Sequence, residues 1–388
     1  MSELPKSAPA YARRAGAEPQ RAYGEPAPVE PDRPSEGRLI EIRREAERRG
    51  RIEGAGIRPA GAPFPMASPE TGYYGIHLLK EPQWNWAIPL YFFVGGAAGA
   101  SSVISTAADW VGDDFDLARK ARWLALGGAG LSSALLVYDL GRPSRFLNML
   151  RVFKPQSPMS MGAWCLTAFA NFTAAAAFFD LVRERFGTSL PVRLLSGATG
   201  AASSLFGMPF SNYTGVLIGA TAVPVWNHNV ETLPIHFGAS GLQSACSLLE
   251  LWGFDDSRAL NMLGVGAAAY ETWEGFHLES DSDRVNDPLK HGPSGWITRL
   301  GGVLSGPVPL VLRVLGGSSG SSRSRSMRRM AAWSGVVGSL LTRYGWMRAG
   351  HSSAQNWRIP LDIAEDSRVN ERLQSKPKLA QARSVEAR

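Results

Sequence analysis

The sequence predicts an all-α integral membrane protein with about eight transmembrane helices and hydrophilic tails. Long runs contain no Asp, Glu, Lys or Arg: residues 82–108, 155–179 and 194–230 are 27, 25 and 37 residues long. A bilayer core requires about 20 largely apolar helical residues, so each run is long enough to cross it. All twelve tryptophans follow residue 83, mostly near the ends of apolar segments. Indoles gather in this way at membrane–water interfaces.

Eight spans are expected in order along the chain. The first four cover residues 87–108, 122–140, 160–181 and 194–218, and the last four cover 233–252, 258–278, 297–316 and 330–348. Charged residues interrupt the last three, but these segments are rich in Gly and Ala, which suits close helix packing in lipid. The alternative is a soluble helical protein with scattered core tryptophans. It is disfavoured because soluble helices rarely continue so far without a charge.

Hydrophilic segments flank the predicted spans. Residues 1–75 are rich in Pro, Gly, Ala and charge, which indicates a disordered or partly helical arm. The membrane domain is expected at 76–350 and a second hydrophilic tail at 351–388. No apolar segment lies near Met1, so no cleavable signal is expected. An even number of spans places both termini on one side, and termini outside would put Arg119, Lys120 and Arg122 in an inside loop.

Several kinds of chemistry lack their sequence signals. No Walker loop, paired zinc spacing or c-type haem motif occurs, and no metal ligands or catalytic residues are expected. The two cysteines, Cys165 and Cys246, are too few for an iron–sulfur cluster, which takes about four thiolates. Six histidines, several in loops, argue against a two-haem cytochrome. The net charge of +7 lacks the interleaved aromatics of a nucleic-acid surface.

Three strings at the edges of loops are more distinctive. They are DLGRPSRF at 139–146, SPMSMGAW at 157–164 and PFSNYTGVL at 209–217. WNW at 84–86 precedes the first span, and RYGWMRAGH at 343–351 leaves the last. Together they resemble the NrfD-like family, the membrane subunits of polysulfide reductase and related molybdopterin complexes. The resemblance covers about residues 73–357, whereas the long N-terminal arm departs from the short family members.

The resemblance implies a haem-free subunit of the cytoplasmic membrane whose first four helices form a quinone-binding bundle. Such a subunit passes electrons between the quinone pool and an iron–sulfur, ferredoxin-like partner, and the clusters and molybdopterin lie only in partner subunits. The molybdopterin partner is catalytic, polysulfide reductase-like or formate dehydrogenase-like. The alternatives are a passive membrane anchor and a secondary transporter, for which no inverted repeat is evident.

Four residues are candidates for quinone binding. Tyr213 lies in a string that the family matches to its quinone pocket, and a neutral phenol can donate a hydrogen bond in lipid. Tyr91 occupies a position where some relatives carry a polar ligand, and Asn212 adjoins Tyr213. Asp139 is a candidate proton acceptor at the pocket, or the ion-pair partner of Arg142. The alternative for Tyr213 is an interfacial or packing role.

The sixth span contains a possible proton path. Tyr270, Glu274 and His277 are spaced to share one helical face, and Glu271 lies about one position away. Charges inside a membrane are costly and are usually functional. The alternative is that this helix leaves the membrane earlier, so that these side chains lie among the headgroups.

The loop between the second and third spans is the candidate docking surface for the iron–sulfur partner. It contains four basic side chains, Arg142, Arg145, Arg151 and Lys154. This charge suits an acidic protein surface. The alternative is binding to lipid headgroup phosphates.

Overall fold

The computed structural model describes residues 81–356, apart from 142, 143, 145 and 318–320, together with the isolated residues Arg44 and Leu79. These residues form helices and connections, without a strand. Most of the predicted N-terminal arm and residues 357–388 of the predicted tail lie outside the described residues. The chain divides into a unit of residues 1–66 with 74–76 and a unit of the remaining residues, to which every helix named below belongs.

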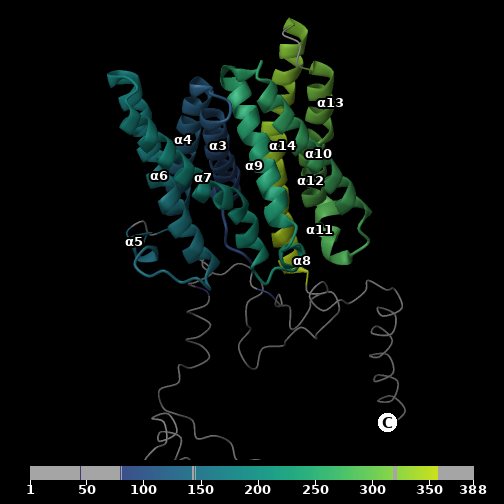
Figure 1. Cartoon of the computed structure of the whole chain (residues 1–388). Coiled ribbons are helices and arrows are strands. Elements are labelled where there is room, and N and C mark those ends of the chain that lie inside the picture. Colours follow the sequence, from purple (N-terminus) through teal and green to yellow (C-terminus); the bar gives the residue numbers. More distant parts are fainter. Residues whose placement is uncertain are drawn as a thin grey trace, which may run out of the picture. The chain divides into compact units, whose positions relative to one another are not determined.

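Four long helices form the first half of the bundle and run alternately between its two ends (Figure 1). They are α3 (Ala87–Trp110), α4 (Phe115–Asp139), α6 (Pro158–Phe186) and α7 (Leu190–Gly219), with the short α5 (Phe146–Met149) in the α4–α6 connection. Helix α3 packs on α4 and α7, and α6 packs on the same two helices. The first half is therefore a four-helix group, and α3 also contacts α9.

The second half continues the same alternation (Figure 1). It comprises α8 (Pro224–His228), α9 (Leu233–Leu249), a wide turn at Glu250–Phe254, α10 (Arg258–Ser280), a short 3-10 turn at Arg284–Asn286, α11 (Asp287–Lys290), α12 (Gly292–Ser305), α13 (Pro307–Gly316) and α14 (Ser322–Gln355). Helix α14 packs on α9, α12 and α13 and also contacts α3, so it joins the two halves.

Two predicted segments differ from the observed helices. The predicted span 297–316 is two helices, α12 and α13, which meet at Gly306 with φ −101° and ψ −95°. The placement of Arg119, Lys120 and Arg122 in a loop is wrong, because α4 already begins at Phe115. The Asp114 side chain accepts a hydrogen bond from the Leu117 N–H and so caps the helix before these charges.

Three helical stretches among the described residues are long and apolar enough to cross a membrane. They are Ala87–Trp110, Pro158–Phe186 and Gly292–Gly316, the last comprising α12 and α13. The remaining helices among the described residues do not combine this length with this hydropathy. Eight membrane spans therefore stay a prediction.

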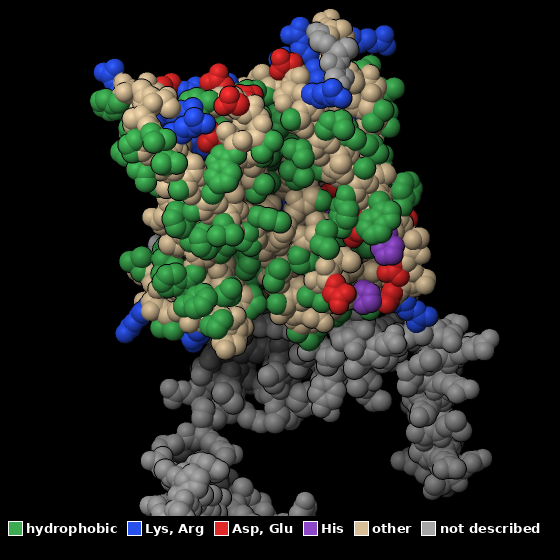
Figure 2. Space-filling view, in the orientation of Figure 1, with side chains coloured by type: hydrophobic (Ala, Val, Ile, Leu, Met, Phe, Trp, Pro, Cys, Tyr) green, Lys and Arg blue, Asp and Glu red, His purple; other side chains and the backbone are tan. Residues whose placement is uncertain are grey.

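The outer surface has the character expected of a lipid-facing bundle. Figure 2 shows hydrophobic side chains over the middle of the visible face and charged side chains towards its ends. Several tryptophans are more than half exposed near helix ends, among them Trp86, Trp110 and Trp296. Two do not follow the predicted interfacial pattern: Trp226 is fully buried, and Trp346 is nearly so.

Glycines let the helices of the first half approach closely. A Cβ atom at Gly99 of α3 would lie 2.3 Å from the Gly207 carbonyl oxygen of α7. A Cβ atom at Gly207 would lie 2.1 Å from the Ser102 hydroxyl oxygen. Small residues at such contacts let backbones touch, which is how helices pack in lipid without a hydrophobic driving force between them.

Candidate functional site

A cavity of about 100 Å³ lies at one end of the first four helices. We call it the first cavity. Each of the four helices contributes a residue to its wall: Tyr91 from α3, Asp139 from α4, Gly162 from α6 and Tyr213 from α7. The remaining wall is largely apolar and includes Ile88, Leu136, Leu166, Leu217 and Trp84. Three of the four residues predicted to bind quinone are thus brought together.

Tyr213 is fixed by contacts with α6. Its hydroxyl donates a hydrogen bond to the carbonyl oxygen of Pro158, at 2.5 Å. Its ring lies directly on Gly162, where a Cβ atom would come within 2.1 Å of the ring. This hydrogen bond supports the packing role considered above, and it uses the only hydrogen that the phenol can donate.

Tyr91 lies deeper in the bundle and is 1% exposed. Its ring contacts those of Phe92 and Phe210, with centroids 5.7 and 6.3 Å away. No hydrogen bond of its hydroxyl is found among the described residues, although Tyr91 lines the cavity. Tyr91 therefore has a hydroxyl donor available to a ligand in this cavity.

Asn212 is not among the residues that line the first cavity. It lies against α9, where a Cβ atom at Gly238 would be 1.7 Å from the Asn212 Oδ1 atom. Adjacent residues of a helix point in different directions, so Tyr213 and Asn212 contact different neighbours. The ion pair considered for Asp139 involves Arg142, which lies outside the described residues.

A larger cavity of about 260 Å³ lies among α9, α10, α12 and α14, and we call it the second cavity. Its wall includes His236, Glu271 and Glu274, which are 6%, 2% and 7% exposed. Ser305 donates a hydrogen bond to Glu271 Oε2 at 2.9 Å. His236 Nδ1 lies 3.9 Å from Glu271 Oε1, beyond hydrogen-bond distance.

His277 does not join Glu271 and Glu274. It is exposed and stacks on Trp273, with ring centroids 5.4 Å apart. Glu271, Glu274 and Leu278 line the second cavity. Tyr270, Trp273 and His277 lie on another face of α10. The histidine at the cavity is His236 of α9, which the sequence pattern did not connect with α10.

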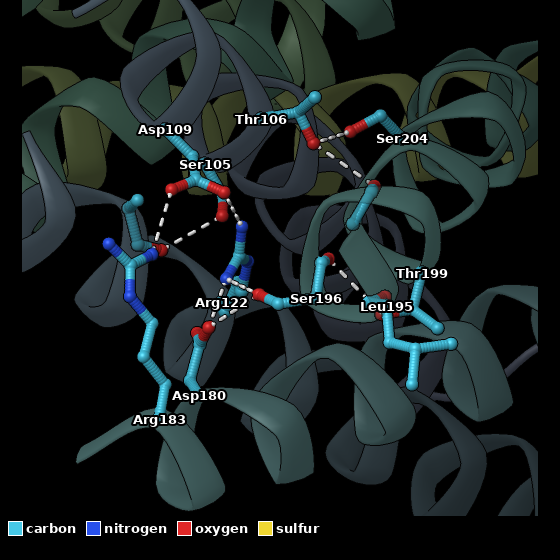
Figure 3. Close-up of polar contacts among 12 residues, drawn as sticks. Ser105, Thr106, Asp109, Arg122, Asp180, Arg183, Leu195, Ser196, Thr199 and Ser204 are labelled. Atoms are coloured by element: carbon cyan, nitrogen blue, oxygen red, sulfur yellow. Dashed lines mark hydrogen bonds and ion pairs between the residues drawn. The ribbon is translucent and has the colours of Figure 1, made fainter. Parts of the chain in front are cut away.

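A buried charged cluster, also missed from the sequence, lies at the opposite end of the first four helices (Figure 3). Arg122 of α4 binds Asp180 of α6, Asp109 of α3 at 2.8 Å and Ser196 of α7 at 3.1 Å. Arg122 and Asp180 are 3% and 1% exposed. In the second half, Arg313 and Glu250 form another fully buried pair.

The sequence contained a signal for these clusters. Asp109, Asp180 and Arg313 each follow directly on an apolar run, and each therefore resembles a charge that ends a membrane span. When two helices pack side by side, charges of opposite sign at the ends of their apolar runs can lie at the same depth. Such charges can form a buried ion pair. Among the described residues, no group of three or more His, Cys, Asp or Glu side chains is placed to hold a metal ion.

Helices with apolar outer faces, close glycine contacts and paired internal charges define a helical membrane protein. Within this class, residues 78–254 match the sequence model of the family described as "Polysulphide reductase, NrfD". The match confirms the resemblance to the NrfD-like family that the loop-edge strings indicated. All residues of the first cavity lie inside the matched segment, whereas Glu271 and Glu274 lie beyond it.

One curated relative is the C subunit of polysulfide reductase from Wolinella succinogenes. It is 27% identical over 183 residues, which cover 42% of this chain and 56% of that protein. The similarity thus spans about half the length of the relative.

Proposed function

We propose that the chain is the quinone/quinol-interacting membrane subunit of a multisubunit molybdopterin/iron–sulfur oxidoreductase. In this function it passes electrons between the quinone pool and an iron–sulfur partner subunit. The first cavity carries the proposal, because it combines two phenols and a carboxylate with apolar walls. The family match over the helices that build this cavity supports it.

The residues of the first cavity suit a quinone headgroup. A bound quinone supplies carrier chemistry in which two electrons travel with two protons. Tyr91 offers a hydrogen-bond donor at the inner wall, and Asp139, at the end of α4, offers a group that can take up or release a proton. Tyr213 serves a ligand only after it releases the carbonyl of Pro158.

The position of the cavity supports partner docking at the same end of the bundle. The α4–α6 connection begins after Asp139, which lines the cavity, and it carries the exposed residues Arg151 and Lys154. A partner bound there would hold its nearest iron–sulfur cluster close to the quinone. Arg142 and Arg145, the other two residues of the predicted docking surface, lie outside the described residues.

Three further features belong to the proposal. The helices cross the cytoplasmic membrane eight times, with α12 and α13 together forming the seventh span. Helix α3 begins and helix α14 ends at the end of the bundle that holds the first cavity, where Gln355 donates a hydrogen bond to Glu81. A proton path runs through Glu271 and Glu274 and includes His236 rather than His277, supported by the burial of these three side chains.

A passive anchor is the second candidate, favoured by the hydrogen bond that occupies the Tyr213 hydroxyl. Tyr213→Phe in the whole complex distinguishes the two. For a quinone site, quinone-linked turnover falls about tenfold or more, since a donor to developing charge is worth at least this much elsewhere. Turnover with a soluble dye that bypasses the membrane stays unchanged.

Tyr344→Phe is the matched control. The Tyr344 hydroxyl also donates to a backbone carbonyl, that of Trp86 at 3.0 Å, but it lies outside the first cavity. It should leave both activities unchanged. Equal quinone-linked turnover in Tyr213→Phe and wild type would favour the passive anchor.

A further inference from the structure

The two cavities differ in the hydrogen-bonding groups that they present. The first contains the free donor of Tyr91. In the second, Glu271 Oε1 and Glu274 Oε2 are buried acceptors without a hydrogen-bond partner, and neither ring nitrogen of His236 has one. Because a buried polar atom without a partner is costly, this cavity is suited to a ligand that donates hydrogen bonds.

The hydroxyl groups around the second cavity add to this acceptor character. Thr272, Thr298 and Thr342 line it, and each donates its hydroxyl hydrogen to a carbonyl one turn back on its own helix, at 2.7 to 3.0 Å. A hydroxyl has one hydrogen, so only its lone pairs remain for a ligand. Arg299, at the edge of the cavity, directs Nε and Nη2 to Glu279.

The break between α12 and α13 supplies another acceptor. Val303 and Pro307 both line the cavity. Proline has no N–H, so the carbonyl of Val303 lacks the donor that a continuous helix would place four residues later. Irregular backbone at membrane depth occurs where it lines a cavity, and this break meets that condition.

The size and walls of the second cavity restrict the ligand. Its volume of about 260 Å³ exceeds that of the first, at about 100 Å³. Phe276, Leu278, Leu289 and Trp346 make much of its wall apolar. A hydrophobic ring that carries hydroxyl donors fits this combination.

The cavities are neighbours through a row of aromatic rings. Tyr91 contacts Phe92, Phe92 contacts Phe237 and Phe237 contacts His236, with centroids 5.7, 6.1 and 5.8 Å apart. A ligand in one cavity is thus three ring contacts from a ligand in the other.

We infer that the second cavity is a binding site for the reduced, hydroxyl-bearing quinol, separate from the site in the first cavity. The identity of the ligand rests on the proposed function, since a quinol is the ring with two hydroxyl donors that such a subunit meets in the membrane. Its hydroxyls donate to Glu271, Glu274 or His236, and the apolar wall contacts its ring.

The test counts sites on the full chain in lipid nanodiscs, by equilibrium dialysis of a decyl-substituted benzohydroquinone kept reduced with ascorbate. Gly302 lines the second cavity, and a Cβ atom there meets nothing within 4 Å, so Gly302→Leu fills the cavity without a clash at Cβ. Wild type should bind two molecules and Gly302→Leu one. Gly266→Leu is the control, because Gly266 is equally open but outside the cavity, and it should retain two.

A second variant removes an acceptor without filling the space. Glu274→Leu should weaken the affected site about tenfold or more, the typical loss for a hydrogen bond to a charged group. Circular dichroism establishes that each variant is folded. If folded Gly302→Leu and Glu274→Leu bind the hydroquinone as wild type does, the inference is wrong.

The test of the second site and the test of the proposed function can fail independently of each other. Tyr213→Phe should weaken binding of the oxidised quinone and leave the site removed by Gly302→Leu intact. Loss of hydroquinone binding only in Tyr213→Phe would overturn the second site and leave the proposed function standing. Loss only in Gly302→Leu would support the second site while contradicting the site assigned to the first cavity.

Discussion

At the scale of single residues, Gly162 decides where Tyr213 lies. A Cβ atom at this position would lie 2.1 to 2.3 Å from three atoms of Tyr213, so Gly162→Ala must displace the phenol. We expect quinone-linked turnover of the complex to fall about tenfold or more, because an error of about 1 Å in position has effects up to 10²-fold. Turnover with the dye measures the catalytic subunit alone and should not change.

Gly130→Ala is the control for this prediction. Gly130 lies in α4, and a Cβ atom there meets nothing within 4 Å. Its turnover should match wild type, and its helix should gain up to about 1 kcal/mol from the higher helix propensity of Ala. Full turnover in Gly162→Ala would mean that the position of Tyr213 is unimportant.

Arg122 and Asp180 are expected to stabilise the folded protein as a pair. Removing one member of a buried ion pair costs about 3–5 kcal/mol when the other charge is left uncompensated. Arg122→Met leaves the Asp180 carboxylate without its cation, whereas Asp180→Leu leaves Arg122 paired with Asp109. Arg122→Met is therefore expected to lower the thermal unfolding midpoint in detergent strongly, and Asp180→Leu to lower it less. Arg122→Met with Asp180→Leu should lower it less than the two single changes summed, since neither buried charge then remains alone.

The exposed pair Arg119–Glu184 provides the comparison for this cycle. Their side chains are 26% and 52% exposed, and exposed pairs contribute little. Glu184→Gln should leave the unfolding midpoint nearly unchanged. Strictly additive losses at Arg122 and Asp180 would show that the two charges do not stabilise each other.

The sequence predicted the first cavity better than the second. Tyr91, Asp139 and Tyr213 were assigned to one site, and the helices bring them together. Asn212 and His277 were selected by their proximity in sequence or spacing along one helix, but neighbouring helices decide which side of α7 and of α10 is inward. His236 and Glu271 belong to different helices, and no pattern within a single helix reveals such a contact.

At the scale of elements, helix order was predictable and helix ends were not. Every predicted span corresponds to a helix, except that 297–316 contains the break at Gly306. The observed helices are mostly longer than predicted, because the apolar run defines a predicted span whereas caps such as Asp114 and Ser157 define a helix. Gly306 followed by Pro307 was the available signal for the break.

The α4–α6 connection is expected to bind the iron–sulfur partner through its positive charge. Replacing Arg151 and Lys154 by Glu is expected to reduce co-purification of the iron–sulfur partner at low salt, since opposite charges steer association and salt screens them. Replacing Arg185 and Arg193, two exposed basic residues near the α6–α7 connection at the opposite end, should have no effect. Equal partner recovery from both variants would indicate that the first loop contacts lipid headgroups instead.

At the scale of the whole molecule, the two cavities lie in different parts of the fold. The NrfD match ends at residue 254, near the end of α9, and includes the helices of the first cavity. The second cavity depends mainly on α10, α12 and α14. Charge patterning predicted a membrane bundle, but it did not reveal two cavities with different hydrogen-bonding groups, because cavities arise from contacts between distant segments.

Photo-crosslinking tests the central claim most directly. An azido derivative of an oxidised quinone is bound to the full chain in membranes, illuminated and located by peptide mapping. We predict labelling of peptides that contain Tyr91, Asp139, Gly162 or Tyr213, with protection by excess unmodified quinone. Labelling confined to peptides outside the first cavity, or labelling that excess quinone does not prevent, would contradict the account.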